Sequence, residues 1–172
     1  DLSFTARVKP PAVPQIVLAP GKDGKVLFTD DFRSQLYLHA GRVTNPAEVK
    51  WAPGALRMYG KAGLINKASV TYHFTCDRPL RDVRVRLACA ADKANFGAGV
   101  ALSLSTDGQT FTEPVTTADG DRAQFSGELA AGPLAAGKDF WVQITLTNTC
   151  GAATTVPSPS VQRLTVEGVL AR

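Results

Sequence analysis

Between Ala68 and Phe111 the chain alternates apolar and polar residues over three consecutive segments. In Ala68–Cys76 and in Asp82–Ala90 every second side chain is apolar, and Gly99–Ser105 repeats the pattern. Because successive side chains of a strand point to opposite faces, a period of two predicts half-buried antiparallel strands. The third segment ends in Thr106-Asp107-Gly108, a sequence that favours a tight hairpin turn.

Shorter alternating segments occupy most of the remaining chain. They are Lys25–Phe32, Gln35–His39, Ala55–Tyr59, Ala123–Leu129, Asp139–Thr149 and Ser160–Leu170. Gly41–Pro53 lies between two of them and is typical of a polar loop. No segment has a convincing period of 3.6, so we expect about nine or ten strands with little or no helix. The pattern predicts an all-β antiparallel sandwich of jelly-roll type, in which the first and last strands pair.

Residues 1–24 differ from the rest of the chain. Pro10, Pro11 and Pro14 interrupt what would otherwise be a strand, and a turn sequence follows at residues 20–24. Proline within sheets is confined to edges, so this part is expected to be a proline-rich linker or edge segment. Residues 25–172 are then one β-sandwich domain, since 172 residues suit a single core. A module taken from a longer protein fits this organisation.

Charge and motif content argue against several function classes. The net charge is only +4 and the basic residues are scattered, whereas nucleic-acid binders concentrate them in a stripe. No apolar run approaches the roughly 18 residues of a membrane span. No nucleophile elbow, phosphate-binding loop or zinc-protease motif occurs, and His39 and His73 lack a metal-binding spacing. We therefore expect that this chain binds neither nucleic acid nor membranes and that it is not an enzyme.

The three cysteines leave two interpretations open. None lies in a Cys-x-x-Cys pair or in a zinc-type spacing. Cys76 and Cys89 are expected to point inward on neighbouring strands, so a disulfide between two of the three is one interpretation. The other is that Cys76, Cys89 and Cys150 are all small apolar side chains of the core.

The strand that contains Trp141 and Gln143 has an informative polar face. An exposed Trp adds apolar surface unless something covers it, and a sugar ring is one such cover. His73, Arg84 and Arg86 occupy the corresponding faces of other strands. If these strands share a sheet, the five side chains form a cationic, amide-bearing platform for a hydroxylated or acidic chain. Alternatively, a loop or the N-terminal segment covers Trp141, and the Arg stems shield the sheet.

Aromatic residues in or beside loops give a second candidate location. Trp51, Tyr37, Tyr59 and Phe96 fall in such places, and the rims of β-sandwiches commonly carry binding loops. Each of them is alternatively a side chain that fills the core.

A structural calcium ion is the one cofactor that the sequence suggests. Asp30, Asp31 and Glu167 converge if the first and last strands pair, which makes them candidate ligands. Asp119 and Asp121 are also spaced like loop ligands. Calcium needs six to eight oxygen ligands, and backbone carbonyls can supply the remainder.

Four stretches carry a resemblance to a known group of proteins. They are Phe28-Thr29-Asp30-Asp31-Phe32, Val70-Thr71-Tyr72-His73-Phe74, Leu104-Ser105-Thr106-Asp107-Gly108 and Leu164-Thr165-Val166-Glu167-Gly168-Val169. Over residues 25–171 the layout resembles carbohydrate-binding modules and galactose-binding-like jelly rolls of secreted bacterial polysaccharide-degrading enzymes. The Leu104–Gly108 stretch and the Thr110-Phe111 that follows also resemble the Asp-box hairpin, in which Asp caps the turn amides and Gly takes a positive φ.

The resemblance implies a non-catalytic accessory module of a secreted, extracellular or cell-surface bacterial protein. Its partners would be a polysaccharide or oligosaccharide, bound on a sheet face or loop rim, and neighbouring domains of the same polypeptide. One alternative is a spacer domain that packs against a catalytic domain and has no ligand. Another is a small polysaccharide-active enzyme. Fold-level analogy carries most of this expectation.

Overall fold

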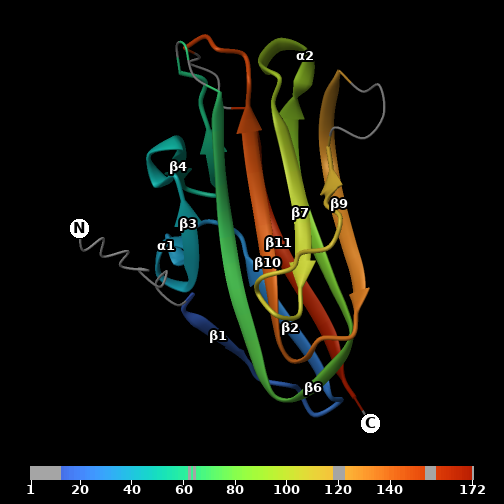
Figure 1. The fold of residues 1–172 in the computed structure, drawn as a ribbon. Coiled ribbons are helices and arrows are strands. Elements are labelled where there is room, and N and C mark those ends of the chain that lie inside the picture. The colour runs from blue at the N-terminus through green and yellow to red at the C-terminus, as the bar shows by residue number, and fades with distance from the viewer. Residues whose placement is uncertain (1–12, 62, 64, 118–122, 154–157, 172) are drawn as a thin grey trace, which may run out of the picture.

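The computed structural model describes residues 13–61, 63, 65–117, 123–153 and 158–171. These residues form a β-sandwich with two short helices and a 3-10 turn (Figure 1). The strands are β1 (Gln15–Leu18), β2 (Lys25–Asp30), β3 (Gly41–Thr44), β4 (Val49–Ala52), β5 (Ala55–Met58), β6 (Asn66–Asp92), β7 (Gly99–Ser105), β8 (Val115–Thr116), β9 (Gln124–Leu134), β10 (Gly137–Asn148) and β11 (Ser160–Leu170). The helical elements are α1 (Leu36–Ala40), η1 (Pro46–Glu48) and α2 (Lys93–Phe96). The predicted all-β class is confirmed, with eleven strands in this part of the chain instead of nine or ten.

The 27-residue strand β6 connects the two layers. Its first arm, residues 66–76, pairs with β10, β3 and β1, and its second arm, residues 80–92, pairs with β11 and β9. Figure 1 shows β6 descending along one layer, turning at the bottom and rising in the other. The two strands predicted at Ala68–Cys76 and Asp82–Ala90 are thus the arms of one element.

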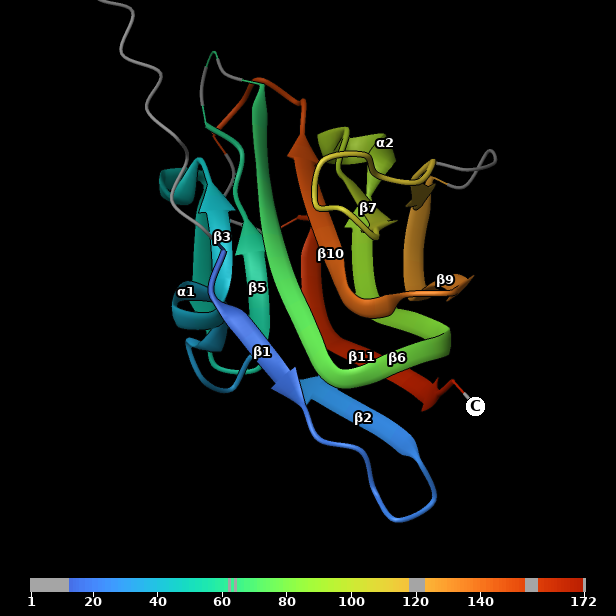
Figure 2. The same cartoon turned by 60° about the horizontal axis from the view of Figure 1, so that its bottom comes forward.

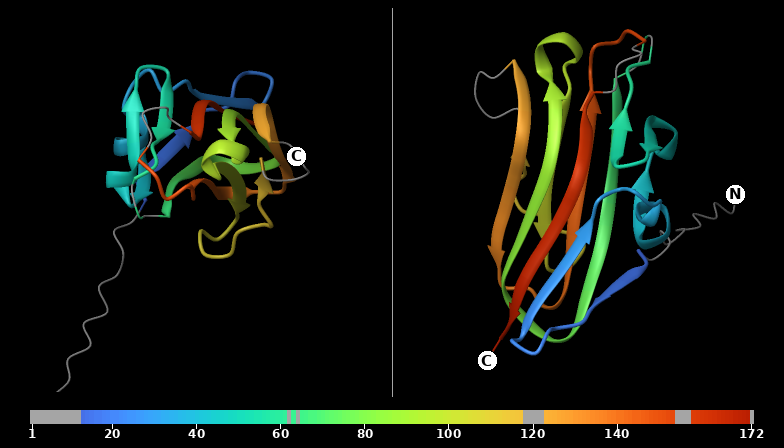
Figure 3. Two further views of the ribbon diagram at one scale, coloured as in Figure 1. Left: turned by 90° about the horizontal axis from the view of Figure 1, so that it is seen from above. Right: turned by 180° about the vertical axis from the view of Figure 1, so that it is seen from behind.

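Each arm of β6 defines a layer (Figure 3). The β10 layer consists of β1, β3, the first arm of β6, β10, β7 and β8. The β11 layer consists of β4, β5, β2, β11, the second arm of β6 and β9. β2 pairs antiparallel with β11, which places Phe28 opposite Val166 and confirms the expected pairing near the two ends of the domain. β1 runs parallel to β6 at the edge of its layer.

The core lies between the layers and follows the predicted alternation. Val70, Tyr72 and Phe74 of β6 are fully buried, as are the apolar positions of β10. Phe74 stacks on Phe140 with ring centroids 5.1 Å apart, and Phe28 meets Phe74 edge-on at 5.0 Å. Because these side chains take every second position, the intervening positions of each strand are left for the outer faces.

The segment Gln35–His39 was expected to be a strand with Leu36 and Leu38 inward, and this prediction is wrong. The structure has helix α1 here, which buries Tyr37 and leaves Leu38 46% exposed. An alternation over only five residues does not distinguish a strand from one helical turn, and tertiary packing decides between them. The predicted loop at Gly41–Pro53 instead contains β3, η1 and β4. None of the helices in the described ranges is long and apolar enough to cross a membrane.

Candidate functional site

The outward side chains of the β10 layer form a surface that we call the polar face. It consists of Arg42 and Thr44 of β3, Ser69, Thr71 and His73 of β6, Ser103 and Ser105 of β7, and Trp141, Gln143, Thr145 and Thr147 of β10. Strand pairing aligns these residues in rows across the sheet. Most of them carry hydroxyl or amide groups, which both donate and accept hydrogen bonds. Thr71, His73, Ser103 and Ser105 are buried, and the other side chains of this face are half-buried or exposed.

The central row of the polar face contains Arg42, Thr71, Gln143 and Ser103. Arg42 and Gln143 flank Thr71 in register, and Ser103 lies on the other side of Gln143. The Gln143 Nε2 donates to Thr71 Oγ1 over 3.2 Å. The buried Nε of Arg42 has no hydrogen-bond partner among the described residues. Since a buried donor without a partner is costly, this row has hydrogen-bonding capacity that the described residues do not use.

Trp141 lies in the next row and both faces of its ring are covered. The His73 imidazole stacks on the indole with centroids 4.2 Å apart and planes 12° from parallel. Gly108 is so close to the indole that a Cβ there would lie 2.8 Å from Cε2. His73 and Gly108 cannot both occupy one face of the ring, so they lie on opposite faces. Figure 2 shows the segment after β7 passing across β10. A loop therefore covers Trp141, and no free indole face is left for sugar stacking.

The covering segment is the hairpin expected from the Asp-box resemblance. The Asp107 carboxylate accepts hydrogen bonds from the backbone amides of Thr110 (2.7 Å) and Gln109 (2.8 Å), and from the Ser105 hydroxyl (2.8 Å). These donors hold the pKa of Asp107 at about 2, below its usual value. Gly108 has a φ of +71°. The hairpin is thereby fixed over one end of the polar face.

Arg84 and Arg86 do not join the polar face. Both belong to the second arm of β6, where Arg84 pairs in register with Glu167 of β11. Their side chains therefore lie on the outer face of the β11 layer, on the opposite side of the sandwich. There Arg86 contacts Glu167 at 3.2 Å and Glu128 at 4.0 Å. The single cationic platform expected from the sequence is thus divided between two surfaces, because β6 turns between its arms.

The loop aromatics do not gather at one rim. Tyr37 is buried, and its ring lies 6.5 Å from that of Phe32. Tyr59 is half-buried, and the Lys50 Nζ lies 5.3 Å from its ring centroid. The backbone of Trp51 belongs to β4, but its side chain lies outside the described part of the structure.

The candidate calcium ligands do not converge. Asp30 points into the sandwich and accepts hydrogen bonds from a tyrosine hydroxyl and a backbone amide, and burial raises its pKa. Asp31 is exposed at the layer edge, and Glu167 points outward from the β11 layer. Asp119 and Asp121 lie outside the described residues. Within the described ranges no three acidic, His or Cys side chains are close enough to hold a metal, so these residues do not fit a calcium site.

The three thiols are free in the structure. Cys76 and Cys89 are buried and Cys150 is half-buried. Burial raises the pKa of Cys89 to about 12. The interpretation that Cys76 and Cys89 are small core side chains agrees with this arrangement.

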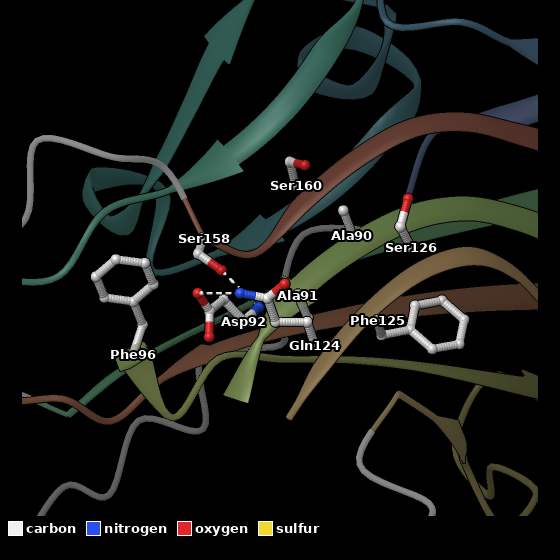
Figure 4. A pocket seen from close by; sticks show the side chains of 9 residues that line it. All are labelled: Ala90, Ala91, Asp92, Phe96, Gln124, Phe125, Ser126, Ser158 and Ser160. Atoms are coloured by element: carbon white, nitrogen blue, oxygen red, sulfur yellow. Dashed lines mark hydrogen bonds between the residues drawn. The ribbon is translucent and has the colours of Figure 1, made fainter. Parts of the chain in front are cut away.

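A hollow of about 520 Å³ lies at one end of the β11 layer (Figure 4). It is lined by Ala90, Ala91 and Asp92 of β6, Phe96 of α2, Gln124, Phe125 and Ser126 of β9, and Ser158 and Ser160 at the start of β11. Of these residues the sequence analysis singled out only Phe96. The others are mostly small residues from three strands far apart in the chain, and no local pattern could have grouped them.

The sequence matches no family model and no curated protein. Two solved structures share the sandwich at low identity. The CBM2 module of Lactobacillus casei BL23 phage J-1 evolved Dit is 9% identical, and the match covers 84% of this chain and 96% of that one with a TM-score of 0.51. The carbohydrate-binding module TmCBM27, described in terms of specific mannan recognition, is 11% identical, with 84% and 98% covered and a TM-score of 0.50. This chain has the fold of a carbohydrate-binding module. The resemblance expected from the sequence is confirmed at the level of the fold.

Proposed function

We propose that this chain is a non-catalytic carbohydrate-binding module that binds a neutral polysaccharide on the polar face. The observation that carries the proposal is the row of Arg42, Thr71, Gln143 and Ser103 from four strands. In this row half-buried Arg42 and Gln143 present donors and acceptors beside the buried hydroxyls of Thr71 and Ser103. The fold shared with two carbohydrate-binding modules supports it by analogy.

The spacing of the polar face suits an extended hydroxylated chain. Neighbouring strands lie about 4.8 Å apart, and residues on one face repeat about every 7 Å along a strand. Next to the central row, the hydroxyls of Ser69 and Thr145 lie 3.0 Å apart and continue the array. The half-buried side chains of Arg42, Gln143 and Thr145 can meet sugar hydroxyls at these intervals, and water-mediated contacts can fill the gaps. Thr71 is buried and positions Gln143 through its hydroxyl.

The opposite outer face is less suited to the same ligand. Arg86 already contacts two carboxylates there, so much of its charge is compensated before any ligand arrives. Arg84 is exposed on that face. An acidic polysaccharide would therefore find less free positive charge than the sequence suggested, and the polar face is the preferred platform.

Affinity electrophoresis tests the proposal. The protein is run in native gels that contain neutral polysaccharides, mannan among them, and in gels that contain an acidic one. We expect retardation by a neutral polymer, and Gln143→Ala should weaken binding about tenfold because it removes an amide from the central row. Arg84→Ala on the opposite layer is the matched surface control. Because it removes one positive charge, its mobility is divided by its own mobility in a gel without polymer, and this ratio should equal that of the wild type. No retardation by any polymer would overturn the function. Loss through Arg84→Ala with no effect of Gln143→Ala would overturn the site.

We also propose that this chain is an accessory module of a secreted bacterial protein. The two solved structures described above are both called modules, which supports attachment to other domains. The flanking sequence of the full-length protein is the test, since an export signal and a polysaccharide-degrading domain should be found there.

A spacer or interaction domain is the second candidate function. On the outer side of the β11 layer, Leu27 of β2 is 69% exposed, and it borders a hollow together with Val169 and Arg84. An exposed apolar side chain on a sheet suits contact with a neighbouring domain. If this function holds, no polymer retards the protein, and the amide of Leu27 exchanges with solvent more slowly in the full-length protein than in the isolated domain.

A further inference from the structure

The hollow at the end of the β11 layer differs in shape and chemistry from the polar face. Figure 4 shows Phe96 at one end of it and the small side chains of Ser160, Ala90 and Ser126 along it. The Phe125 ring points away from Ser126 and packs against the core. The Phe96 ring is half-buried, so part of it is accessible. Its volume of about 520 Å³ falls in the range of small-molecule sites. The hollow is therefore large enough for a compact ligand, whereas the polar face offers a flat surface.

Asp92 is the fixed polar group of this hollow. Its carboxylate accepts hydrogen bonds from the side-chain amide (2.8 Å) and the backbone amide (2.9 Å) of Asn95, and from Gln124 Nε2 (3.3 Å). The Asn95 donors hold the pKa of Asp92 below its usual value, so the group is ionised. With the backbone amide of Ala94 as a further donor, most of the acceptor sites of this carboxylate are used, so Asp92 holds Gln124 in place at the rim. An ionised carboxylate also repels anionic ligands.

Neutral groups at the rim complete the hydrogen-bonding set. Gln124 uses one amide hydrogen toward Asp92, and its carbonyl oxygen has no partner among the described residues. The hydroxyl oxygen of Ser160 accepts from Gln162 Nε2 over 2.8 Å, which leaves its proton free to be donated. The Ser126 hydroxyl is exposed and makes no hydrogen bond within the described ranges. Donors and acceptors thus surround the small side chain of Ala90, and the Phe96 ring lies at one end.

We infer that this hollow is a second glycan site, which takes a neutral mono- or disaccharide unit such as the end of a chain. The Phe96 ring and the Ala90 side chain meet the C–H face of a sugar ring, and Gln124, Ser126 and Ser160 meet its hydroxyls. The inference rests on the proposed function. It adds a shorter ligand, a mono- or disaccharide unit, at a site separate from the polar face. Two sites on one module would raise its avidity for a polysaccharide without any new contact at either site.

Amide NMR spectra recorded with glucose, galactose, mannose, xylose and their disaccharides test the inference. We expect at least one sugar to shift the backbone amides of Ala91, Gln124 and Ser126. Gln124→Ala should weaken this binding about fivefold to tenfold, because one or two hydrogen bonds are lost. Ser126→Phe should abolish it by filling the hollow, since residue 126 is exposed on a strand that tolerates an aromatic side chain. Gln109→Ala, on the distant hairpin, is the control and should bind like the wild type.

Two results would overturn the inference. One is the absence of shifts at the hollow with every sugar tested. The other is an unchanged response of the hollow amides in Ser126→Phe. Retention of the wild type in polysaccharide gels, weakened by Gln143→Ala, would show in either case that the proposed function stands and that only the second site fails. Loss of both signals would remove the function as well.

Discussion

The hydrogen bond between Tyr72 and Asp30 offers a test of how the interior is held together. The Tyr72 hydroxyl donates to Asp30 Oδ2 over 3.0 Å, and the backbone amide of Phe32 donates to Oδ1 over 2.9 Å. Tyr72 is fully buried and Asp30 only 3% exposed. Desolvation keeps the pKa of Tyr72 well above its usual value, so the hydroxyl stays protonated and acts as the donor.

Tyr72→Phe removes this donor without changing the packing volume. A hydrogen bond to a charged group contributes about 1.5–3 kcal/mol, so we expect the free energy of unfolding at neutral pH to fall by about that amount. For a domain of this size the melting temperature should fall by about 3–12 °C. Tyr59→Phe, at a half-buried tyrosine whose hydroxyl has no hydrogen bond within the described residues, is the matched control.

The sign of the pH dependence follows from the raised pKa of Asp30. Burial is its main cause, and the hydrogen bonds from Phe32 and Tyr72 oppose it. A raised pKa means that the folded state binds the proton more tightly than the unfolded chain, whose value is 3.8. The contribution of Asp30 to stability is therefore fully present below 3.8 and is lost as the pH rises through the folded pKa. Removal of the Tyr72 donor raises that pKa further.

Urea denaturation at neutral pH and near pH 3.8 measures both effects. We expect the difference between Tyr72→Phe and the wild type to be largest at neutral pH and smaller at the acidic end, where Asp30 is increasingly protonated. A loss below about 0.5 kcal/mol at neutral pH, the range of ordinary surface substitutions, would refute the reasoning. A loss that does not change with pH would show that Asp30 is not the partner that matters.

Two further predictions concern the hairpin and the thiols. Gly108→Ala should destabilise the protein by about 1–3 kcal/mol more than Gly54→Ala. Both positions have a positive φ, but only at Gly108 would a Cβ meet Trp141. Thermal melts followed by Trp fluorescence measure the two losses of stability, and equal losses would contradict the prediction. The Cys89 thiol, with a pKa of about 12, should react with a thiol reagent at mildly alkaline pH far more slowly than half-buried Cys150. Mass mapping of labelled peptides with and without denaturant checks this order, and fast labelling of Cys89 in the folded protein would speak against its burial.

The sequence predicted most of the sandwich because its signal is local. Val70, Tyr72 and Phe74 take alternate positions, as do Val142 and Ile144, and all five are fully buried. An alternation of this kind determines which face of a strand is buried, whichever strand lies next to it. The hairpin at Asp107 was predicted for the same reason, since its hydrogen bonds reach only three residues along the chain.

The candidate site depended on information that a local pattern does not contain. Alternation placed Arg84 and His73 on outer faces, but it could not show that the turn within β6 sends them to opposite sides of the sandwich. The path of a loop is equally invisible to a period of two, so the cover over Trp141 was only one of two interpretations. Helix α1 was missed because Leu36 and Leu38 alternate by chance over a stretch too short to decide.

The turn in β6 also has a mechanical consequence. β1 begins at Gln15, opposite His73 on the first arm, and β11 ends at Leu170, opposite Leu80 on the second arm. In a longer polypeptide under tension, the two flanks would therefore pull on the two arms of β6, on either side of its turn. His73 lies two residues from Thr71, so such a force would act next to the central row of the polar face.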